Sequence, residues 1–327
     1  MKAAVYHKYG PPDVVELKEI PKPTIKDDEV LIKIVATTVS SADWRARSLS
    51  VPAGFGLIVR LVFGISGPRK KVLGTELAGE IVATGKDVTK FKKGDQVFAF
   101  PGGNLGCHAE YRTMHEDAPI ALKPANLAYE EAAAISFGGT TALDFLRDKG
   151  KIQSGEKVLI NGASGAVGTA AVQLAKYFGA EVTGVCSSAN LELVKSIGAD
   201  KVIDYTSEDF TKNGETYDII MDTVGTAPWS RSKDSLTETG RVLLVLAGLS
   251  DMLQAPFVSK ANGKKAIAGV AREAAEDLRF LAELAEAGKF KPVIDRRYPL
   301  EQIAEAHAYV DTGRKRGSVV ITVEHDD

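Results

Sequence analysis

The sequence has few of the residues on which several protein classes depend. Only two cysteines, Cys107 and Cys186, occur in 327 residues, too few for a disulfide scaffold or a cysteine-built zinc site. The longest apolar run, 55–63, contains Arg60 and is too short to cross a bilayer. Neither sign of charge dominates, because 41 Lys and Arg against 43 Asp and Glu leave a net charge of −2. We therefore expect no transmembrane segment, no general attraction to nucleic acid, and a reducing, cytoplasmic environment.

The patterns that are present divide the chain into two kinds of structure. Up to about Leu122, short alternating strand patterns are separated by Gly and Pro, which favours a β-barrel-like unit. From Lys157 to about Gly248, apolar strands alternate with helical patterns, which indicates an α/β fold with a parallel sheet covered on both faces. We predict a barrel domain at 1–124, a nucleotide-binding domain at 125–266, and a segment at 267–327 that returns to the barrel.

A glycine turn lies between the first strand and first helix of the α/β part. Its pattern is Ala163-x-Gly165-x-x-Gly168, one glycine short of the usual dinucleotide fingerprint. Gly165 lets the backbone approach a pyrophosphate, Gly168 lets the helix pack on its strand, and the helix amides face the negative charge. The alternative is a plain strand-to-helix turn. We expect a dinucleotide to contact Ser164, Gly165, Ala166 and Val167.

The end of the second α/β strand decides which dinucleotide is expected. Many NAD-binding proteins place an acid there, which hydrogen-bonds to the ribose and repels a 2′-phosphate. Here the positions hold Ser187 and Ser188, which carry hydroxyls and no charge, and Tyr205 closes the third strand. NADPH is therefore favoured over NADH. The alternative is that these serines only cap the following helix.

Several motifs together resemble a known family. They are "VLGTELAGEIVATGKDVTKFKKGDQV", the glycine turn, "GAD" followed by "VIDY", and "GRKRGSVVI". In this order they are similar to the medium-chain dehydrogenase/reductase superfamily, and within it to the zinc-independent quinone oxidoreductase branch. The resemblance implies a GroES-like β-barrel catalytic domain interrupted by a Rossmann domain. It also implies reduction of a small hydrophobic quinone or α,β-unsaturated carbonyl with NADPH, and a homodimer as the expected assembly.

The departures from zinc-using members of the superfamily bear on a metal. Those enzymes have a cysteine where Ser40 stands and a histidine where Thr75 stands. Serine and threonine hydroxyls do not replace such ligands, and Asp43 with Glu76 makes a poor zinc site. We therefore expect no metal.

The resemblance also implies roles for further residues. Ser40 and Thr140 are expected to contact the nicotinamide or the substrate carbonyl. The alternatives are that "SADW" is a helix N-cap signal, with Ser41 or Asp43 as the cap, and that Thr140 is a buried helical threonine bonding to its own turn. Thr223 is expected at the edge of the cofactor crevice, and Ser164 and Tyr205 on its adenosine side. The basic run either clamps the cofactor phosphates or is a solvated turn; it consists of Arg314, Lys315 and Arg316.

Two questions stay open at the level of the sequence. The apolar stretch 52–71 either covers an active-site mouth or is buried in ordinary core or in a partner. No general acid can be named, so a non-catalytic NADPH-binding sensor or interaction protein remains an alternative to the reductase. A zinc-free alcohol dehydrogenase-like enzyme is a third reading.

Overall fold

Contacts within the chain divide it into two compact units. The computed structural model describes residues 1–261 and 263–325. The barrel unit comprises Met1–Val51, Leu57–Phe137 and Glu273–Asp327, and the Rossmann unit comprises Pro52–Gly56 and Gly138–Arg272. The domain boundaries expected from the sequence, at 124/125 and 266/267, remain predictions.

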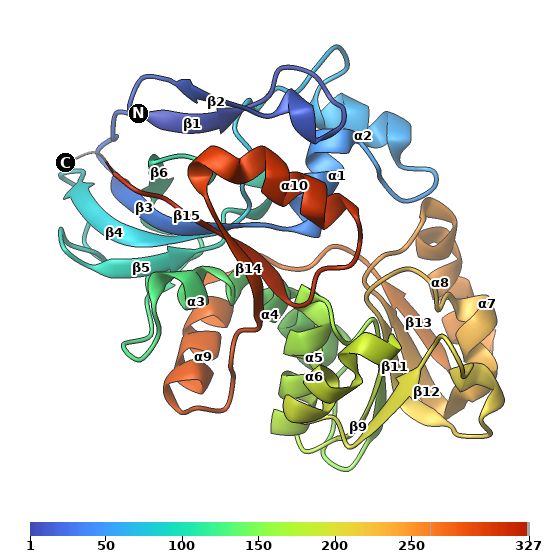
Figure 1. Ribbon diagram of the computed structural model, residues 1–327. Helices are drawn as coiled ribbons and strands as arrows, with labels where there is room; N and C mark the ends of the chain where they lie inside the picture. Colours follow the sequence, from blue (N-terminus) through green and yellow to red (C-terminus); the bar gives the residue numbers. More distant parts are fainter. Residues whose placement is uncertain (262, 326–327) are drawn as a thin grey trace. The chain divides into compact units, whose positions relative to one another are not determined.

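The barrel unit is built on one curved, mostly antiparallel sheet (Figure 1). The sheet runs β14-β15-β3-β4-β5-β7, with β6 also paired to β3, and β1 pairs with β2 separately. Val30, Ile32 and Ile34 on β3 are fully buried in its core, so the expected short strands are confirmed. The strands are β1 (Lys2–Val5), β2 (Glu16–Glu19), β3 (Glu29–Val39), β4 (Leu77–Thr84), β5 (Gln96–Ala99), β6 (Tyr111–His115), β7 (Ile120–Leu122), β14 (Ile294–Pro299) and β15 (Ser318–Thr322).

Helices close the barrel unit and connect its distant segments. In Figure 1, α10 lies across β15 and β3, and its apolar face joins the barrel core. The Arg47 guanidinium at the end of α1 donates to both carboxylate oxygens of Asp311 on α10, with N···O distances of 2.5 and 2.6 Å. The helices are α1 (Ser41–Ser48), α2 (Gly56–Phe63), α3 (Tyr129–Ala133), α9 (Ala275–Glu286) and α10 (Ile303–Asp311).

The Rossmann unit contains the expected parallel sheet. Its order is β10-β9-β8-β11-β12-β13, and every neighbouring pair is parallel. In chain order this is third-second-first-fourth-fifth-sixth, the Rossmann order, so the strand order reverses between β8 and β11. The strands are β8 (Lys157–Asn161), β9 (Glu181–Cys186), β10 (Lys201–Asp204), β11 (Tyr217–Asp222), β12 (Leu236–Leu244) and β13 (Lys265–Ala268). The helices are α4 (Ser136–Leu143), α5 (Ala166–Tyr177), α6 (Leu191–Ser196), α7 (Trp229–Ser232) and α8 (Leu249–Ala261).

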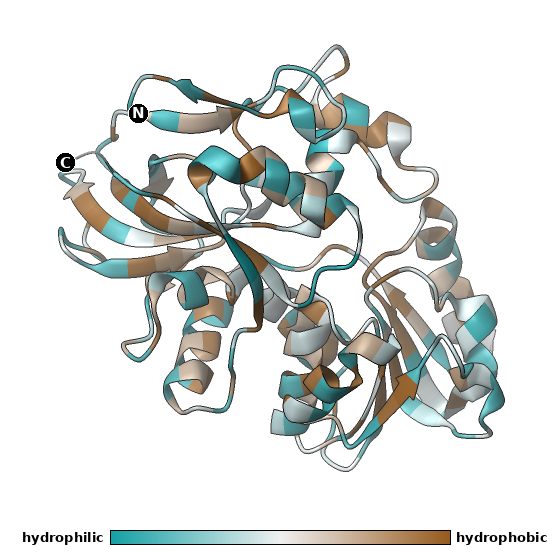
Figure 2. Cartoon of the chain, in the orientation of Figure 1, coloured by the Kyte–Doolittle hydropathy of each residue, from teal (hydrophilic) through white to brown (hydrophobic). Residues whose placement is uncertain are grey.

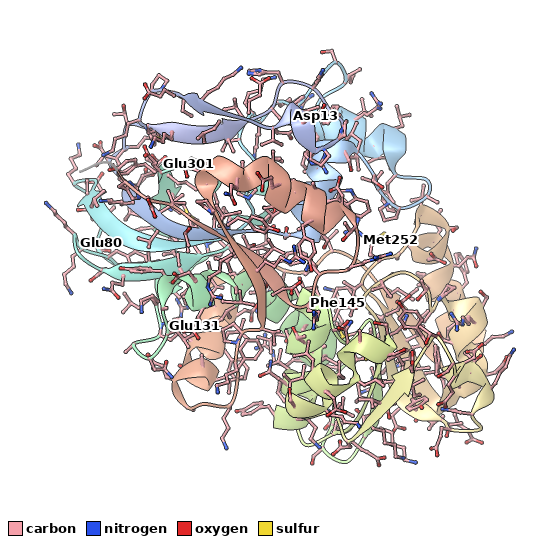
Figure 3. The ribbon with its side chains drawn as sticks, viewed as in Figure 1. Asp13, Glu80, Glu131, Phe145, Met252 and Glu301 are labelled. Atoms are coloured by element: carbon pink, nitrogen blue, oxygen red, sulfur yellow. The ribbon has the colours of Figure 1, made fainter. Side chains whose placement is uncertain are left out.

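The helical pattern at 127–148 is confirmed, but the helix is not continuous. It divides into α3, α4 and a π-helical turn, η3 (Asp144–Lys149). Within the Rossmann unit, α4 lies very close to the start of α5, because a Cβ at Gly138 would lie 2.4 Å from the carbonyl oxygen of Ala166. Phe145 on η3, labelled in Figure 3, is buried with an exposed fraction of 1%.

Candidate functional site

The glycine turn after β8 forms an open site at the start of α5. Gly162 adopts a φ of 83°, which favours glycine. A Cβ at Gly168 would lie 2.1 Å from the carbonyl oxygen of Gly162, so only glycine permits this packing. A Cβ at Gly165 would meet nothing closer than 3.7 Å. Gly165 is the N-cap of α5. Among the described residues, no side chain makes a capping hydrogen bond to the first amides of this helix. Its N-terminal amides are therefore suited to an anion at the point where the strand order reverses.

A buried carboxylate lies at the carboxyl end of β11, the strand next to β8. Asp222, at the end of β11, accepts hydrogen bonds from the Asn161 side chain (2.9 Å) and from the amides of Gly225 (3.0 Å) and Ala227 (2.8 Å). The Thr223 hydroxyl donates to the carbonyl oxygen of Asn161 at 2.8 Å. The Thr223 hydroxyl thus joins the carboxyl ends of β8 and β11, and its place at the edge of a cofactor crevice stays a prediction.

Asn190 connects two of the predicted cofactor residues. Its side-chain amide donates to the hydroxyl oxygens of Ser164 (3.1 Å) and Ser187 (3.2 Å). Ser187 occupies the N-cap position of the short turn η4 (Ser188–Asn190), but its hydroxyl makes no capping hydrogen bond there. Among the described contacts, the Ser187 side chain therefore does not act as a helix cap.

An acid, Asp204, lies beside Ser188. It stands at the end of β10, whereas the acid typical of NAD-binding proteins would stand at the end of β9. The Ser188 hydroxyl donates to Asp204 at the end of β10, with an O···O distance of 2.6 Å. The hydrogen bond from Ser188, followed by those from Thr206, lowers the pKa of Asp204. The carboxylate is therefore negative at neutral pH. The next residue, Tyr205, is largely exposed. The uncharged pocket expected from Ser187 and Ser188 thus has a negative neighbour.

In the barrel unit, Ser40 and Thr75 meet on a buried carboxylate. The Asp43 Oδ2 accepts from the Ser40 hydroxyl (2.6 Å) and lies 3.4 Å from the Thr75 hydroxyl, while Oδ1 accepts from the amide of Gly74 (2.9 Å). Ser40 is the N-cap of α1 and Asp43 its capping-box partner. The helix N-cap signal of "SADW" is therefore confirmed, but the capping residue is Ser40 and not Ser41 or Asp43. Because its hydroxyl proton is directed to Asp43, the catalytic role of Ser40 stays a prediction.

Glu76 forms a second buried polar centre next to the first. Its carboxylate accepts from the Thr38 hydroxyl and from the Phe137 amide, the latter at 2.5 Å. Burial raises the pKa of Glu76 to about 8, although both hydrogen bonds act in the opposite direction. Burial likewise lowers the pKa of Lys315 to about 8, and the negative charge of Glu76 counteracts this. The charge of each group therefore shifts the pKa of the other.

The donors at these positions do not fit zinc. The Ser40 and Thr75 hydroxyl oxygens lie 3.2 Å apart, and both already bond to Asp43. Zinc sites use Cys, His and carboxylate ligands. Within residues 1–261 and 263–325, no group of three or more His, Cys, Asp and Glu side chains is arranged to hold a metal ion.

The remaining predicted residues are divided between the two units. Thr140 is fully buried in α4 of the Rossmann unit, whereas Ser40 belongs to the barrel unit. The basic run 314–316 also belongs to the barrel unit. There Arg316 faces Asp295, and the Lys315 ammonium donates to the carbonyl oxygen of Gly317 at 2.7 Å. The roles of Thr140 and of this run stay predictions.

Sequence reasoning missed Asn190 and Asp204. Asp204 was detectable, because the carboxyl ends of neighbouring parallel strands meet at one edge of a sheet. The last residue of "KVID" is therefore adjacent to the serines that follow β9. The burial of Glu76 had no comparable signal, because it depends on contacts with Thr38 and Phe137, which are distant in the sequence.

Comparison with known families agrees with this architecture. The model described as "Alcohol dehydrogenase GroES-like domain" matches residues 26–125, and that described as "Zinc-binding dehydrogenase" matches 197–321. The structure of a quinone oxidoreductase from Coxiella burnetii superimposes with a TM-score of 0.87 at 30% identity, covering 99% of each chain.

Curated relatives extend the match to the whole chain. A 2-methylene-furan-3-one reductase of Solanum lycopersicum is 36% identical over 98% of this chain and 79% of its own length. A chloroplastic NADPH-dependent alkenal/one oxidoreductase of Arabidopsis thaliana is 32% identical over the same shares. An enzyme that uses a nicotinamide cofactor follows from these matches together with the glycine turn. The chain therefore belongs to the medium-chain dehydrogenase/reductase superfamily, in its zinc-independent quinone oxidoreductase branch.

Proposed function

We propose that this protein reduces quinones or α,β-unsaturated carbonyls with NADPH and without zinc. The observation that carries the proposal is the joint bonding of the Ser40 and Thr75 hydroxyls to Asp43. At the two positions where zinc-using members of the superfamily have metal ligands, this chain has hydroxyl groups that are already hydrogen-bonded to Asp43. Without a Lewis acid, hydride removal from a plain alcohol is hard, whereas a quinone or enone carries its own electron-withdrawing carbonyl.

The residues of the Rossmann unit support the cofactor half of the proposal. The α5 amides and the open side of Gly165 would hold the pyrophosphate, and Ser187 with Asn190 would face the 2′-phosphate. When bound, NADPH supplies the hydride, while the chain orients its nicotinamide and excludes water. The preference for NADPH also has the support of the Arabidopsis relative, which is named for it. The proton that accompanies the hydride would come from water or from a hydroxyl that we do not assign.

We extend the proposal to a homodimer in a reducing compartment such as the cytoplasm. Both cysteines are free and buried, as expected where disulfides do not form. Among the described residues, no helix is long and apolar enough to cross a membrane. Some relatives are named for the chloroplast.

The function is tested by following NADPH oxidation with 1,4-benzoquinone, a short enone and, in the reverse direction, a primary alcohol with NADP⁺. We expect turnover with at least one of the two acceptors and none with the alcohol. Turnover with the alcohol alone would contradict the proposal, as would NADPH binding with no oxidation by any acceptor.

A further inference from the structure

The helix α2 carries apolar side chains that face outward. Leu57, Ile58, Leu61 and Val62, followed by Ile65, have exposed fractions of 45–73%. None of the eight helix residues, all of them in the described part of the chain, is buried. Figure 2 shows apolar residues on this surface helix. Isolated exposed apolar residues need no explanation, but a cluster of five on one short segment indicates a binding surface.

The geometry of α2 shows that this surface is a second apolar face. At 3.6 residues per turn, Leu57, Leu61, Ile58 and Val62 fall within an arc of about 140°. Phe63 lies on the opposite side of the helix, about 170° from the centre of that arc. Its ring packs against the barrel core. Since Phe63 already fixes the inward face, the outward arc is available to a partner.

The segment that contains this arc is strongly basic. Residues 52–71 include Arg60, Arg69, Lys70 and Lys71 and no acid, although the whole chain has a net charge of −2. Arg60 and Arg69 are exposed. Burial raises the pKa of Tyr9, and both guanidinium groups act against that shift. The Tyr9 hydroxyl donates to the carbonyl oxygen of Gly64 at 2.9 Å, which fixes the end of α2 beside these charges.

We propose that α2 and the basic turn after it form a peripheral docking surface for a membrane leaflet containing anionic phospholipid. The apolar arc would enter the boundary between headgroups and acyl chains, and the cations would contact lipid phosphates. The charge distribution favours this occupant. A second copy of the same face would bring two basic segments together, and a neutral quinone gives no role to the cations. Binding through one short helix is weak and reversible, with each cation strengthening it by about fivefold.

The test is flotation of the full chain with phosphatidylcholine vesicles, with and without phosphatidylserine. We expect binding to the anionic vesicles only, weakened by salt. The double variants Leu57→Glu/Leu61→Glu and Arg60→Glu/Arg69→Glu should each reduce this binding more than about tenfold. The matched control is Leu122→Glu, because Leu122 on β7 is also an exposed leucine, and it should bind like the unmodified protein. Melting curves verify that each variant is folded.

Other outcomes overturn the proposal. Absence of binding to anionic vesicles, equal binding to neutral vesicles, or equal loss in the Leu122 control would each do so. If Leu57→Glu/Leu61→Glu instead dissociates an oligomer in sedimentation velocity and leaves flotation unchanged, the face belongs to a second copy of the chain. Since flotation involves neither cofactor nor acceptor, its failure leaves the proposed function untouched.

Discussion

At the scale of single residues, the cofactor preference depends on the balance between Ser187 and Asp204. The Ser187 hydroxyl is uncharged and bonded only to the neutral Asn190 side chain among the contacts described. Asp204 is ionised and accepts a hydrogen bond from the hydroxyl of the next residue, Ser188. A 2′-phosphate near Ser187 would therefore find a donor beside it and a negative charge at greater distance.

Placing a charge directly at Ser187 should reverse this balance. We predict that Ser187→Asp weakens NADPH binding by more than about tenfold and changes NADH binding little, because a carboxylate repels the 2′-phosphate. The measurement is a fluorescence titration with each cofactor. Ser196→Asp, at the last residue of α6, adds the same charge away from Ser187 and serves as the control. Equal losses for both cofactors in Ser187→Asp would show that the phosphate lies elsewhere.

Removing the existing charge should have the opposite effect. Asp204→Asn keeps an acceptor for Ser188 and abolishes the repulsion, so NADPH should bind about threefold more tightly, most clearly at low salt. The same titration at two salt concentrations measures this. A weaker binding of NADPH by Asp204→Asn would mean that the carboxylate orders the pocket rather than repelling its ligand.

Glu76 should make stability depend on pH. Its pKa of about 8 in the fold lies above the ordinary value of 4.5. The neutral acid therefore stabilises the fold below about pH 4.5, and this contribution is lost as the pH rises toward 8, at up to about 1.4 kcal/mol per pH unit. In Glu76→Gln, the Gln oxygen can accept from Phe137 and its amide can donate to Thr38, without a charge.

We accordingly predict that Glu76→Gln flattens the loss of stability between about pH 5 and pH 7.5. Urea unfolding at both pH values measures the difference. The control is Glu80→Gln on β4, the strand that directly follows Glu76 (Figure 3), and it should retain the slope of the unmodified protein. Parallel slopes in all three proteins would show that Glu76 is ionised throughout this range. Keeping below pH 8 avoids the opposite contribution of Lys315, whose pKa is lowered.

At the scale of elements, two glycines of the same turn have different roles: Gly168 is needed for packing, and Gly165 is expected to be needed for cofactor binding. Gly168 lies against the backbone of Gly162, whereas Gly165 has free space around it and a φ of −79° that alanine also adopts. We predict that Gly168→Ala destabilises the protein by several kcal/mol, on the order of other overpacked sites. Gly165→Ala should melt like the unmodified protein and yet lose most of its NADPH binding, because the methyl group occupies the approach to the pyrophosphate.

Thermal melting with and without NADPH distinguishes these two effects. If Gly165→Ala still gains as much melting temperature from NADPH as the unmodified protein does, the pyrophosphate does not pass this residue. If Gly168→Ala melts normally, α5 does not pack on its strand as described.

The elements also show what a sequence can and cannot predict. The strands β8 and β11 were predictable because continuous apolar runs such as "VLI" and "IIM" have few alternatives in an α/β chain. The division of 127–148 into α3, α4 and η3 was not, because the helical period of the sequence runs through all three segments. The exposed face of α2 was likewise hidden, since a helical apolar pattern fits buried and exposed helices equally well.

At the scale of the whole molecule, the order of motifs predicted both folds, because each motif has a fixed place in the family. The sites were only partly predictable. Ser164, Gly165 and Ser187 lie together in the Rossmann unit, whereas the engagement of Ser40 with Asp43 depends on the way α1 begins after β3. The sequence offered both a substrate role and a helix N-cap for this segment, and the coordinates show the Ser40 hydroxyl engaged in the cap.

The measurement that tests the central claim most directly is a titration of chelator-treated protein with NADPH, followed by one equivalent of 1,4-benzoquinone or an enone. The account predicts quenching of tryptophan fluorescence on binding and loss of nicotinamide fluorescence when one of the acceptors is added, at the same rate with and without added zinc. Oxidation that appears only after zinc is restored would contradict it, as would tight binding of NADPH that neither acceptor oxidises.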